Sequence, residues 1–305
     1  MDTFPVPKRT FLPNLQRAEP LARDHSATNV FKECPRKYFY RMVLGFDRKD
    51  NPPWFGFGTA YHKYREVLEK EYVSIGAQMA HVKALEAALN LYPNNPDPIK
   101  YKKHKHLTKI RLIESCNVAY AHWEIEKKQR RIEVIGVEED FAIVDEISGM
   151  LITGKADQII KHNGRVWGRD FKTSSKIGPW YERSHEPNDQ VTRYTWALGQ
   201  LTQTMVQGIY YEVLHQTEKE KPKIINYTLS RNPAQIQKWL EETRLYEQLI
   251  NVCRDNDTWP MNEKACQYCE YHSCCKTLNE AHLEVQLKDN FKFKPWDSQN
   301  RDTDD

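Results

Sequence analysis

The sequence predicts an α+β fold in which one mixed central β-sheet is flanked by helices. Two observations favour this class. Helical patterns come first and are followed by three alternating strand segments, a helix, two more strands and a long helix. In addition, Asn163-Gly164 stands between alternating apolar runs, which is the strongest short-range signal for a hairpin. The middle strands are therefore expected to be antiparallel neighbours.

Several helices are expected before the sheet. Residues 26–41 resemble a capped helix that is interrupted near Pro35. A second helix opens at about Trp54 and runs to about Tyr72, with apolar residues on one face and His62 in its first turn. Residues 77–131 are predicted to form a helical insertion, a lid or a wall of a DNA channel, broken at the prolines of 93–98.

The strands and helices that follow alternate in a regular order. Asn232 is expected to cap the last long helix, with Pro233 in its first position. The predicted strands are 133–145, 151–161, 166–172, 208–215 and 223–230, the last two forming a second hairpin, and the predicted helices are 188–207 and 232–254.

The predicted domain boundaries follow composition. Residues 1–25 are polar and proline-bearing and are expected to form a flexible arm. Residues 26–285 form the folded domain, which includes the insertion 77–131 and a cysteine cluster at 266–275. Residues 286–305 are expected to be an acidic-ended tail.

Composition narrows the class of protein. The chain has 305 residues, of which 39% are hydrophobic and 29% charged, and it contains no apolar run near the roughly 20 residues of a membrane helix. Its first residues lack the apolar stretch of a signal peptide, so a cytoplasmic protein without a membrane partner is expected. The net charge of +3 says little about partners, although basic residues cluster at 100–106 and 127–131. Such clusters are usually solvated helix faces, but phosphate backbones attract the same residues.

The candidate metal-binding residues lie on the predicted hairpin. If its loop consists of Asn163 and Gly164 alone, Asp157 lies opposite Asp170. Like charges in this position destabilise a sheet, so the pair needs a cation, and a divalent metal is the natural candidate. Because side chains alternate along a strand, Lys172 projects on the same face as Asp170. The alternative is an ordinary exposed polar face of a hairpin.

Seven cysteines in an intracellular chain indicate metal or redox chemistry rather than disulfides. Cys266, Cys269 and Cys275 form a compact Cys-x2-Cys-x5-Cys pattern, which can hold one metal centre. A fourth ligand is needed, and spacing alone does not choose it. Cys34 is preferred over Cys274, Cys253, Cys116 and His272.

A nucleotide-binding pattern in the same region is rejected. Residues 149–155 satisfy Gly-x4-Gly-Lys, the start of a P-loop. However, Ala156 stands where a hydroxyl should bind magnesium, and a strand follows instead of a helix. ATP binding is not expected at this site.

Taken in order, the motifs resemble the RecB-type branch of the PD-(D/E)XK nucleases that carries an iron–sulfur cluster, to which the AddB helicase-nuclease subunit and the CRISPR-adaptation nucleases belong. Any one motif is weak, but the ordered set is specific and spans about residues 26–280. The matching pieces are Phe31-x-x-Cys34-Pro-Arg-Lys-Tyr-Phe-Tyr-Arg41, Gly58-Thr-Ala-Tyr-His62, Gly154-Lys-Ala-Asp157, Asp170-Phe-Lys172-Thr173, Gln190-Val-Thr-Arg-Tyr194 and Cys266-x2-Cys269-x5-Cys275.

The resemblance implies a restriction-endonuclease-like core with two inorganic sites. A 4Fe-4S cluster would join the N- and C-terminal segments through Cys34, Cys266, Cys269 and Cys275. Zinc suits four cysteines equally well on chemical grounds. Mg²⁺ or Mn²⁺ would be held by His62, Asp157, Asp170 and the backbone carbonyl of Phe171.

The resemblance also assigns roles around the metal. Lys172 would position the attacking water or balance charge on the phosphate, and Gln190 and Tyr194 would orient DNA or the lysine. Glu138 resembles a further family carboxylate, although Glu139 and Asp140 are adjacent. The plainer interpretations are that His62 is an ordinary helix-start histidine and that Gln190 and Tyr194 are core-edge residues.

The expected activity is that of a metal-dependent deoxyribonuclease, an exonuclease acting on DNA ends or single strands in replication, recombination or repair. A helicase or recombination protein is the expected partner, because no helicase motif is visible in the chain. The alternatives are a non-catalytic DNA-binding scaffold of a recombination complex, a CRISPR-adaptation nuclease and a zinc-stabilised interaction protein. The helical insertion favours a repair role or a viral one in the host cytoplasm.

Overall fold

The computed structural model describes residues 12, 14–18, 22–277 and 279–297. Its described residues form two compact units, each assembled from segments that are not consecutive in the chain. Unit 1 draws on 1–50, 142–154 and 238–305, and unit 2 on 51–141 and 155–237. Most of the predicted arm lies outside the described residues. None of the described helices is both long and apolar enough to cross a bilayer.

A five-stranded sheet with the order β2-β3-β4-β5-β6 confirms the predicted mixed α+β class. β3 pairs with β4 antiparallel, β4 with β5 parallel, and β5 with β6 antiparallel, so the second predicted hairpin is also confirmed. The strands are β2 (Ile132–Val144), β3 (Leu151–His162), β4 (Arg165–Ser174), β5 (Val206–His215) and β6 (Lys223–Ser230).

The β3–β4 hairpin has the predicted register. His162 pairs with Arg165, and the ladder continues in step to Gln158 and Arg169. Asn163 and Gly164 have φ of 50° and 74°. Positive φ at both central residues is what a type I′ turn requires, so the Asn-Gly pair sets the register. Asp157 and Asp170 are the next residues of the two strands beyond the last pair.

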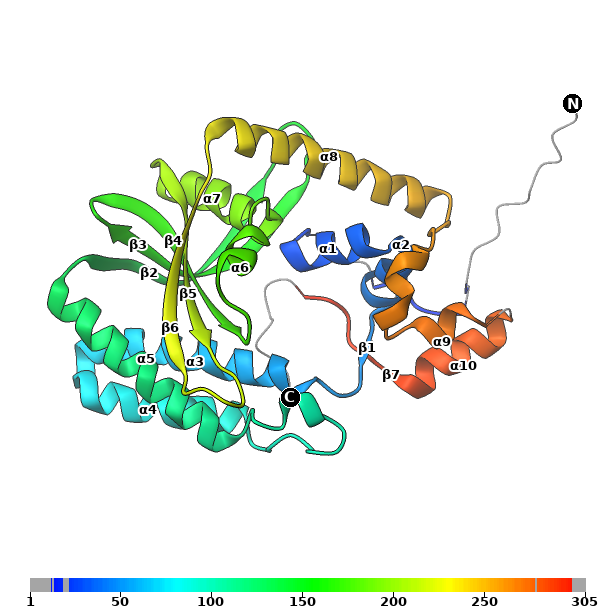
Figure 1. Cartoon of the computed structure of the whole chain (residues 1–305). Helices are drawn as coiled ribbons and strands as arrows, with labels where there is room; N and C mark the ends of the chain where they lie inside the picture. Colours follow the sequence, from blue (N-terminus) through cyan, green and yellow to red (C-terminus); the bar gives the residue numbers. More distant parts are fainter. Residues whose placement is uncertain (1–11, 13, 19–21, 278, 298–305) are drawn as a thin grey trace, which may run out of the picture. The chain divides into compact units, whose positions relative to one another are not determined.

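Three long helices of unit 2 lie together along one side of the sheet, as Figure 1 shows: α3 (Pro53–Ile75), α4 (Ala77–Leu91) and α5 (Lys109–Gln129). Their buried side chains form one apolar cluster with Phe171 of β4 and Leu214 of β5. Because α3 begins at Pro53, His62 lies in the third turn of the helix and not in the first as predicted.

The connection between β4 and β5 contains α6 (Pro179–Arg183), which the sequence did not predict, and α7 (Asp189–Thr202). The predicted helix 188–207 is too long at its C-terminal end. Gln203 has φ of 49°, a left-handed conformation that ends a helix, and Val206 already belongs to β5. Leu198 of α7 packs with Ala156 and Ile159 of β3.

Unit 1 has its own core. The break at Pro35 is confirmed, because α1 (His25–Glu33) ends there, and α2 (Pro35–Tyr38) continues into a short π-helix η1 (Phe39–Val43). Trp259 stacks on the rings of Tyr38 and Phe39 at centroid distances of 5.7 and 5.5 Å. The unit also contains most of α8 (Pro233–Asp255), together with η3 (Glu263–Tyr268) and α9 (His272–Cys275).

The predicted C-terminal tail is ordered in part. The expected boundary at residue 286 falls inside α10 (Glu280–Asn290), and β7 (Phe291–Phe293) then pairs antiparallel with β1 (Phe46–Arg48). Leu283 and Leu287 lie one turn apart on α10 and are buried, and they join the buried Phe291 of β7 in the core of unit 1.

Candidate active site

Asp157 is held by contacts on two sides. The Nδ1 of His62 lies 3.2 Å from Oδ2 of Asp157, and the backbone N–H of Phe171 donates to the same oxygen at 2.8 Å. The helix α3 therefore supplies the imidazole, β3 supplies the carboxylate, and β4 fixes its direction. The side chain of His62 remains about one-third exposed, with 34% of its area accessible.

Asp170 is paired with the lysine that follows it on the same strand face. The Nζ of Lys172 lies 2.6 Å from Oδ2 of Asp170. Gln190, in the first turn of α7, links the two residues: its Oε1 accepts from Lys172 at 3.1 Å, and its Nε2 donates to Oδ1 of Asp170 at 3.3 Å. The structure therefore brings together Asp170, Lys172 and Gln190 as one hydrogen-bonded group.

The two aspartates differ in electrostatics. Burial acts to raise the pKa of Asp157, but the charge of His62 and the Phe171 N–H outweigh it and hold that pKa below its usual value. Burial together with the negative charge of Asp157 raises the pKa of Asp170 despite Lys172. The hairpin register predicted that the two carboxylates lie close together. The effect of Asp157 on the pKa of Asp170 is consistent with that proximity.

The two cations of the site stay protonated at neutral pH. Burial lowers the pKa of His62, but the carboxylates of Asp157 and then Asp170 raise it to about 9. Burial likewise opposes the charge of Lys172, and Asp170 outweighs it, so the pKa of Lys172 lies above its ordinary value. Both acidic groups are thus compensated by protein cations.

Glu138 joins this group from β2. Its Oε2 lies 2.8 Å from Nζ of Lys155, and burial followed by the nearby Asp157 raises its pKa to about 7. Glu138 has φ of 57°, so the strand is irregular there and simple alternation does not give the direction of its side chain. For this reason the sequence could not separate Glu138 from Glu139 and Asp140.

Two tyrosines near the lysine were not predicted. The ring of Tyr211 lies 5.4 Å from Nζ of Lys172, and Tyr211 pairs with Asp170 across the parallel β4–β5 register. Tyr181 of α6 has its pKa raised to about 12 by burial, with a further contribution from Asp170. Tyr194, which was predicted, is buried and packs edge-on against Phe141 at a centroid distance of 5.6 Å.

One further cluster, made of a histidine and two glutamates, was not predicted from the sequence. Among the described residues, the one set of three potential ligands whose atoms all lie within 4.8 Å is His122, Glu126 and Glu212; His62, Asp157 and Asp170 do not meet that distance. However, Glu126 accepts from Arg169 at 2.8 Å, and Glu212 pairs with Arg169 and, at 3.2 Å, with Arg65. Two guanidinium groups already balance two carboxylates, so we interpret this set as a buried structural ion-pair network.

Four of the seven cysteines line one cavity of unit 1. Cys34 lies between α1 and α2, Cys266 in η3, Cys269 directly after η3, and Cys275 at the end of α9. Cys274 instead belongs to the apolar core and is fully buried. The structure therefore groups the four predicted cysteines and places the neighbouring Cys274 elsewhere.

The spacing and protonation of these thiols bear on which metal centre they could bind. No three of them, within the described residues, have sulfur atoms within 4.8 Å of one another. A tetrahedral zinc with bonds near 2.3 Å needs sulfurs about 3.8 Å apart, which is closer than this arrangement. Burial raises the pKa of Cys269 to about 11 and raises that of Cys275, so both thiols are protonated at neutral pH.

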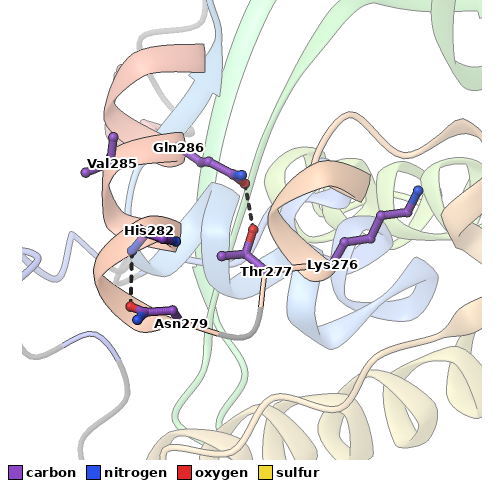
Figure 2. Close-up of a pocket in the computed structure, with 6 residues that line it drawn as sticks. All are labelled: Lys276, Thr277, Asn279, His282, Val285 and Gln286. Carbon is purple, nitrogen blue, oxygen red and sulfur yellow. Dashed lines mark hydrogen bonds between the residues drawn. The ribbon is translucent and has the colours of Figure 1, made fainter.

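One hollow of unit 1, with a volume of about 520 Å³, contains neither site. Figure 2 shows that its lining residues come from the end of α9 and from α10. It has no carboxylate or thiol among its lining residues, which makes it a poor metal site. Its lining residues are Lys276, Thr277, Asn279, His282, Val285 and Gln286.

The mixed sheet thus carries two aspartates and a lysine on the neighbouring strands β3 and β4. The family model described as the PD-(D/E)XK nuclease superfamily matches residues 25–276, and the chain belongs to that superfamily. Comparison with curated protein sequences finds no match.

One solved structure shows a similar fold. A crystal structure from Eubacterium rectale, described as a putative exonuclease, aligns with a TM-score of 0.52 at 12% identity, covering 92% of this chain and 95% of the other. At that identity the similarity shows the fold alone. A structure of SSO0001 covers 71% of this chain and 84% of its own at 17% identity, with a TM-score of 0.30 that is too low to support a comparison.

Proposed function

We propose that the protein is a metal-dependent deoxyribonuclease, an exonuclease that hydrolyses phosphodiester bonds at DNA ends or in single strands. The observation that carries this proposal is the group formed by Asp157, Asp170 and Lys172 at the β3–β4 hairpin. A scaffold protein has no need for two repelling buried carboxylates, so catalysis is the function that accounts for their cost.

The metal ligands would be His62, Asp157, Asp170 and the carbonyl of Phe171. Their donor set of oxygens with one imidazole suits Mg²⁺ or Mn²⁺. The fit is supported by the raised pKa of Asp170, which a dication would bring down. Asp170 must then exchange its contact with Lys172 for the metal. When bound, the ion would polarise the phosphate and lower the pKa of a water.

The remaining side chains divide the work of proton transfer and charge balance. Lys172 keeps its proton at neutral pH, so it would stabilise negative charge on the phosphate and would not act as a base. Gln190 fixes the position of the ammonium through its 3.1 Å hydrogen bond. Glu138, with a pKa of about 7, is the best placed group to accept a proton from the attacking water.

We further propose that Cys34, Cys266, Cys269 and Cys275 hold a 4Fe-4S cluster. Their common cavity supports this, and four cysteine thiolates are the usual ligands of such a cluster. The cluster would act structurally, because it would join two segments of unit 1 that are far apart in the sequence. A helicase or recombination protein remains the proposed partner, with a setting in replication, recombination or repair.

The decisive experiment is digestion of end-labelled single-stranded and double-stranded DNA with Mn²⁺ or Mg²⁺. We expect mononucleotides or short fragments to be released from an end, and no release when EDTA is present. A wild-type protein that binds DNA but leaves it intact with either metal would contradict the nuclease proposal and favour the scaffold.

A further inference from the structure

An exposed cluster of aromatic rings lies at the start of α3 in unit 2. Trp54 and Phe55 expose 41% and 58% of their areas, although side chains of this size are usually covered. The ring of Trp54 lies 6.5 Å from that of Phe55, 6.3 Å from Tyr101 and 4.4 Å from His104, measured between centroids. Four rings from two segments of the chain are therefore gathered at one place.

The loop that brings Tyr101 and His104 to α3 is well braced. Asp97 accepts from the backbone N–H groups of Ile99 and Lys100 at 2.8 and 3.1 Å. At its base, the hydroxyl of Tyr92 donates to the carbonyl of Leu107 at 2.7 Å, and the Tyr92 ring packs edge-on against Phe57 of α3. These contacts hold the loop beside α3. None of them involves the side chains of Trp54, Phe55, Tyr101 or His104, so they do not explain why those rings are gathered there.

The same loop is strongly basic. Lys102, Lys103 and Lys105 are exposed, and Lys100 lies 5.3 Å from the centre of the Tyr101 ring. Of the nearby acidic side chains, Asp97 is engaged with the loop backbone and Glu218 pairs with Lys105 at 2.9 Å. Positive charge therefore remains around the rings, which is the combination that single-stranded nucleic acids require: cations for phosphates and ring faces for unpaired bases.

We propose that this aromatic–basic platform, formed by Trp54, Phe55, Tyr101, His104 and the lysines of 100–105, binds single-stranded DNA by stacking on its bases. The inference rests on the proposed function and adds a substrate surface to it. Stacking needs unpaired bases, so the platform selects a single strand over a duplex.

The helix α3 joins this platform to the candidate active site. Phe55 and His62 are seven residues apart and therefore lie on the same face of the helix, about 10 Å apart along its axis. Thr59, between them on that face, is exposed as well. A strand stacked on the platform would reach His62 after roughly three nucleotides at the 3.4 Å rise of a stacked strand.

The test compares binding of a labelled oligothymidylate and a blunt duplex by fluorescence anisotropy, in EDTA so that no cleavage occurs. We expect the double variant Trp54→Ala/Phe55→Ala to bind the single strand roughly 10- to 100-fold more weakly and the duplex nearly as wild type. Lys102→Ala/Lys103→Ala should weaken binding of both and reduce the salt slope by about 0.7 for each phosphate that is no longer neutralised.

Two controls keep the result specific. Leu245→Ala/Lys238→Ala removes one exposed apolar residue and one exposed lysine from α8 and should leave both affinities unchanged. Trp54→Phe/Phe55→Tyr keeps the rings and should retain single-strand binding, which separates stacking from a folding defect.

Equal weakening in the α8 control, or unchanged single-strand affinity in the Trp54→Ala/Phe55→Ala variant, would overturn the platform. Neither outcome bears on whether the wild-type protein cleaves DNA with Mn²⁺. Conversely, absence of cleavage would remove the proposed nuclease function while leaving the binding measurement interpretable.

Discussion

The candidate active site of unit 2 and the cysteine cavity of unit 1 have opposite electrostatic arrangements. Asp157 and Asp170 already have cations beside them in His62 and Lys172. The thiols of Cys269 and Cys275 are partly buried with raised pKa, and no arginine or lysine overcomes that partial burial. Asp157 therefore keeps its charge without a metal, because its pKa is lowered, and Asp170 holds a raised pKa beside Lys172. The thiols, by contrast, become thiolates only when an inorganic group binds them.

The difference teaches what each group contributes. The candidate active site already balances its carboxylates with protein cations, so a metal would change its chemistry more than its fold. The cysteine cavity gains its charge and its crosslink together, so a cluster would supply folding free energy to unit 1. Loss of the metal and loss of the cluster should therefore have different consequences, and four experiments sharpen or break this contrast.

Cys34→Ala should have the largest effect and should act on stability. Removing one end of a crosslink that closes a loop of this length costs roughly 4–5 kcal/mol in the chain-entropy picture. We expect loss of iron, of visible absorbance in anaerobically purified protein and of much of the thermal stability. Cys253→Ser, a change at a partly buried cysteine of α8, serves as the control and should keep its iron. Full iron content in Cys34→Ala would remove that residue from the site.

Lys172→Ala should act on catalysis with little effect on DNA affinity. Loss of the ammonium removes charge stabilisation at the phosphate, and we expect the cleavage rate to fall by roughly 10²- to 10³-fold. Single-turnover digestion and DNA binding, measured on the same preparation, give the two quantities. A cleavage rate equal to that of the wild type would exclude Lys172 from the mechanism.

Glu138→Gln tests the proton acceptor. We expect the rate to fall by about a hundredfold, and the acidic limb of the pH–rate profile near pH 7 to disappear. Glu139→Gln is the matched control on the same strand and should retain both rate and profile. A profile that keeps its acidic limb in Glu138→Gln would assign that limb to another group.

The smallest effect concerns pH and metal affinity. In the metal-free protein the His62–Asp157 ion pair contributes stability that is fully present below pH 6.5 and is lost as pH rises through about 9, because the folded-state pKa of His62 is raised. Metal binding to His62 requires the neutral imidazole, so it should have the opposite slope. We expect Mn²⁺ affinity to increase about tenfold per pH unit between pH 7 and 9.

His62→Asn is the control for this dependence and should bind Mn²⁺ more weakly with a flat profile over the same range. Isothermal titration calorimetry in buffers of different ionisation enthalpy counts the released proton directly. Binding to the wild type without proton release above pH 7 would show that His62 is not a ligand.

The parts predicted well from sequence are those set by local signals. Asn163-Gly164 has one favourable turn type, and the turn fixes the register of both strands and the proximity of Asp157 and Asp170. The cysteine pattern was equally local for Cys266, Cys269 and Cys275. The choice of Cys34 came from resemblance, because a distant ligand has no spacing rule.

Features set by irregular backbone or by tertiary packing were not predictable. The left-handed conformation of Gln203 ends α7 earlier than predicted. The side-chain direction of Glu138 follows from a positive φ that no sequence motif indicates. In the sequence, Glu212 is an ordinary strand residue. Its ion pairs with Arg65 of α3 and Arg169 of β4 form only in the folded structure. By contrast, the four-residue spacing of Leu283 and Leu287 indicates one face of a helix and could have been used to predict α10.

The order of segments in unit 1 has a consequence during synthesis. Cys34 leaves the ribosome first, and all of unit 2 is translated before Cys266 appears. At ordinary elongation rates this interval is on the order of 10–50 s. With Cys34 as a cluster ligand, as proposed, its thiol would have to stay reduced and unreacted for that time, so we expect anaerobic growth or early iron supply to raise the yield of intact protein.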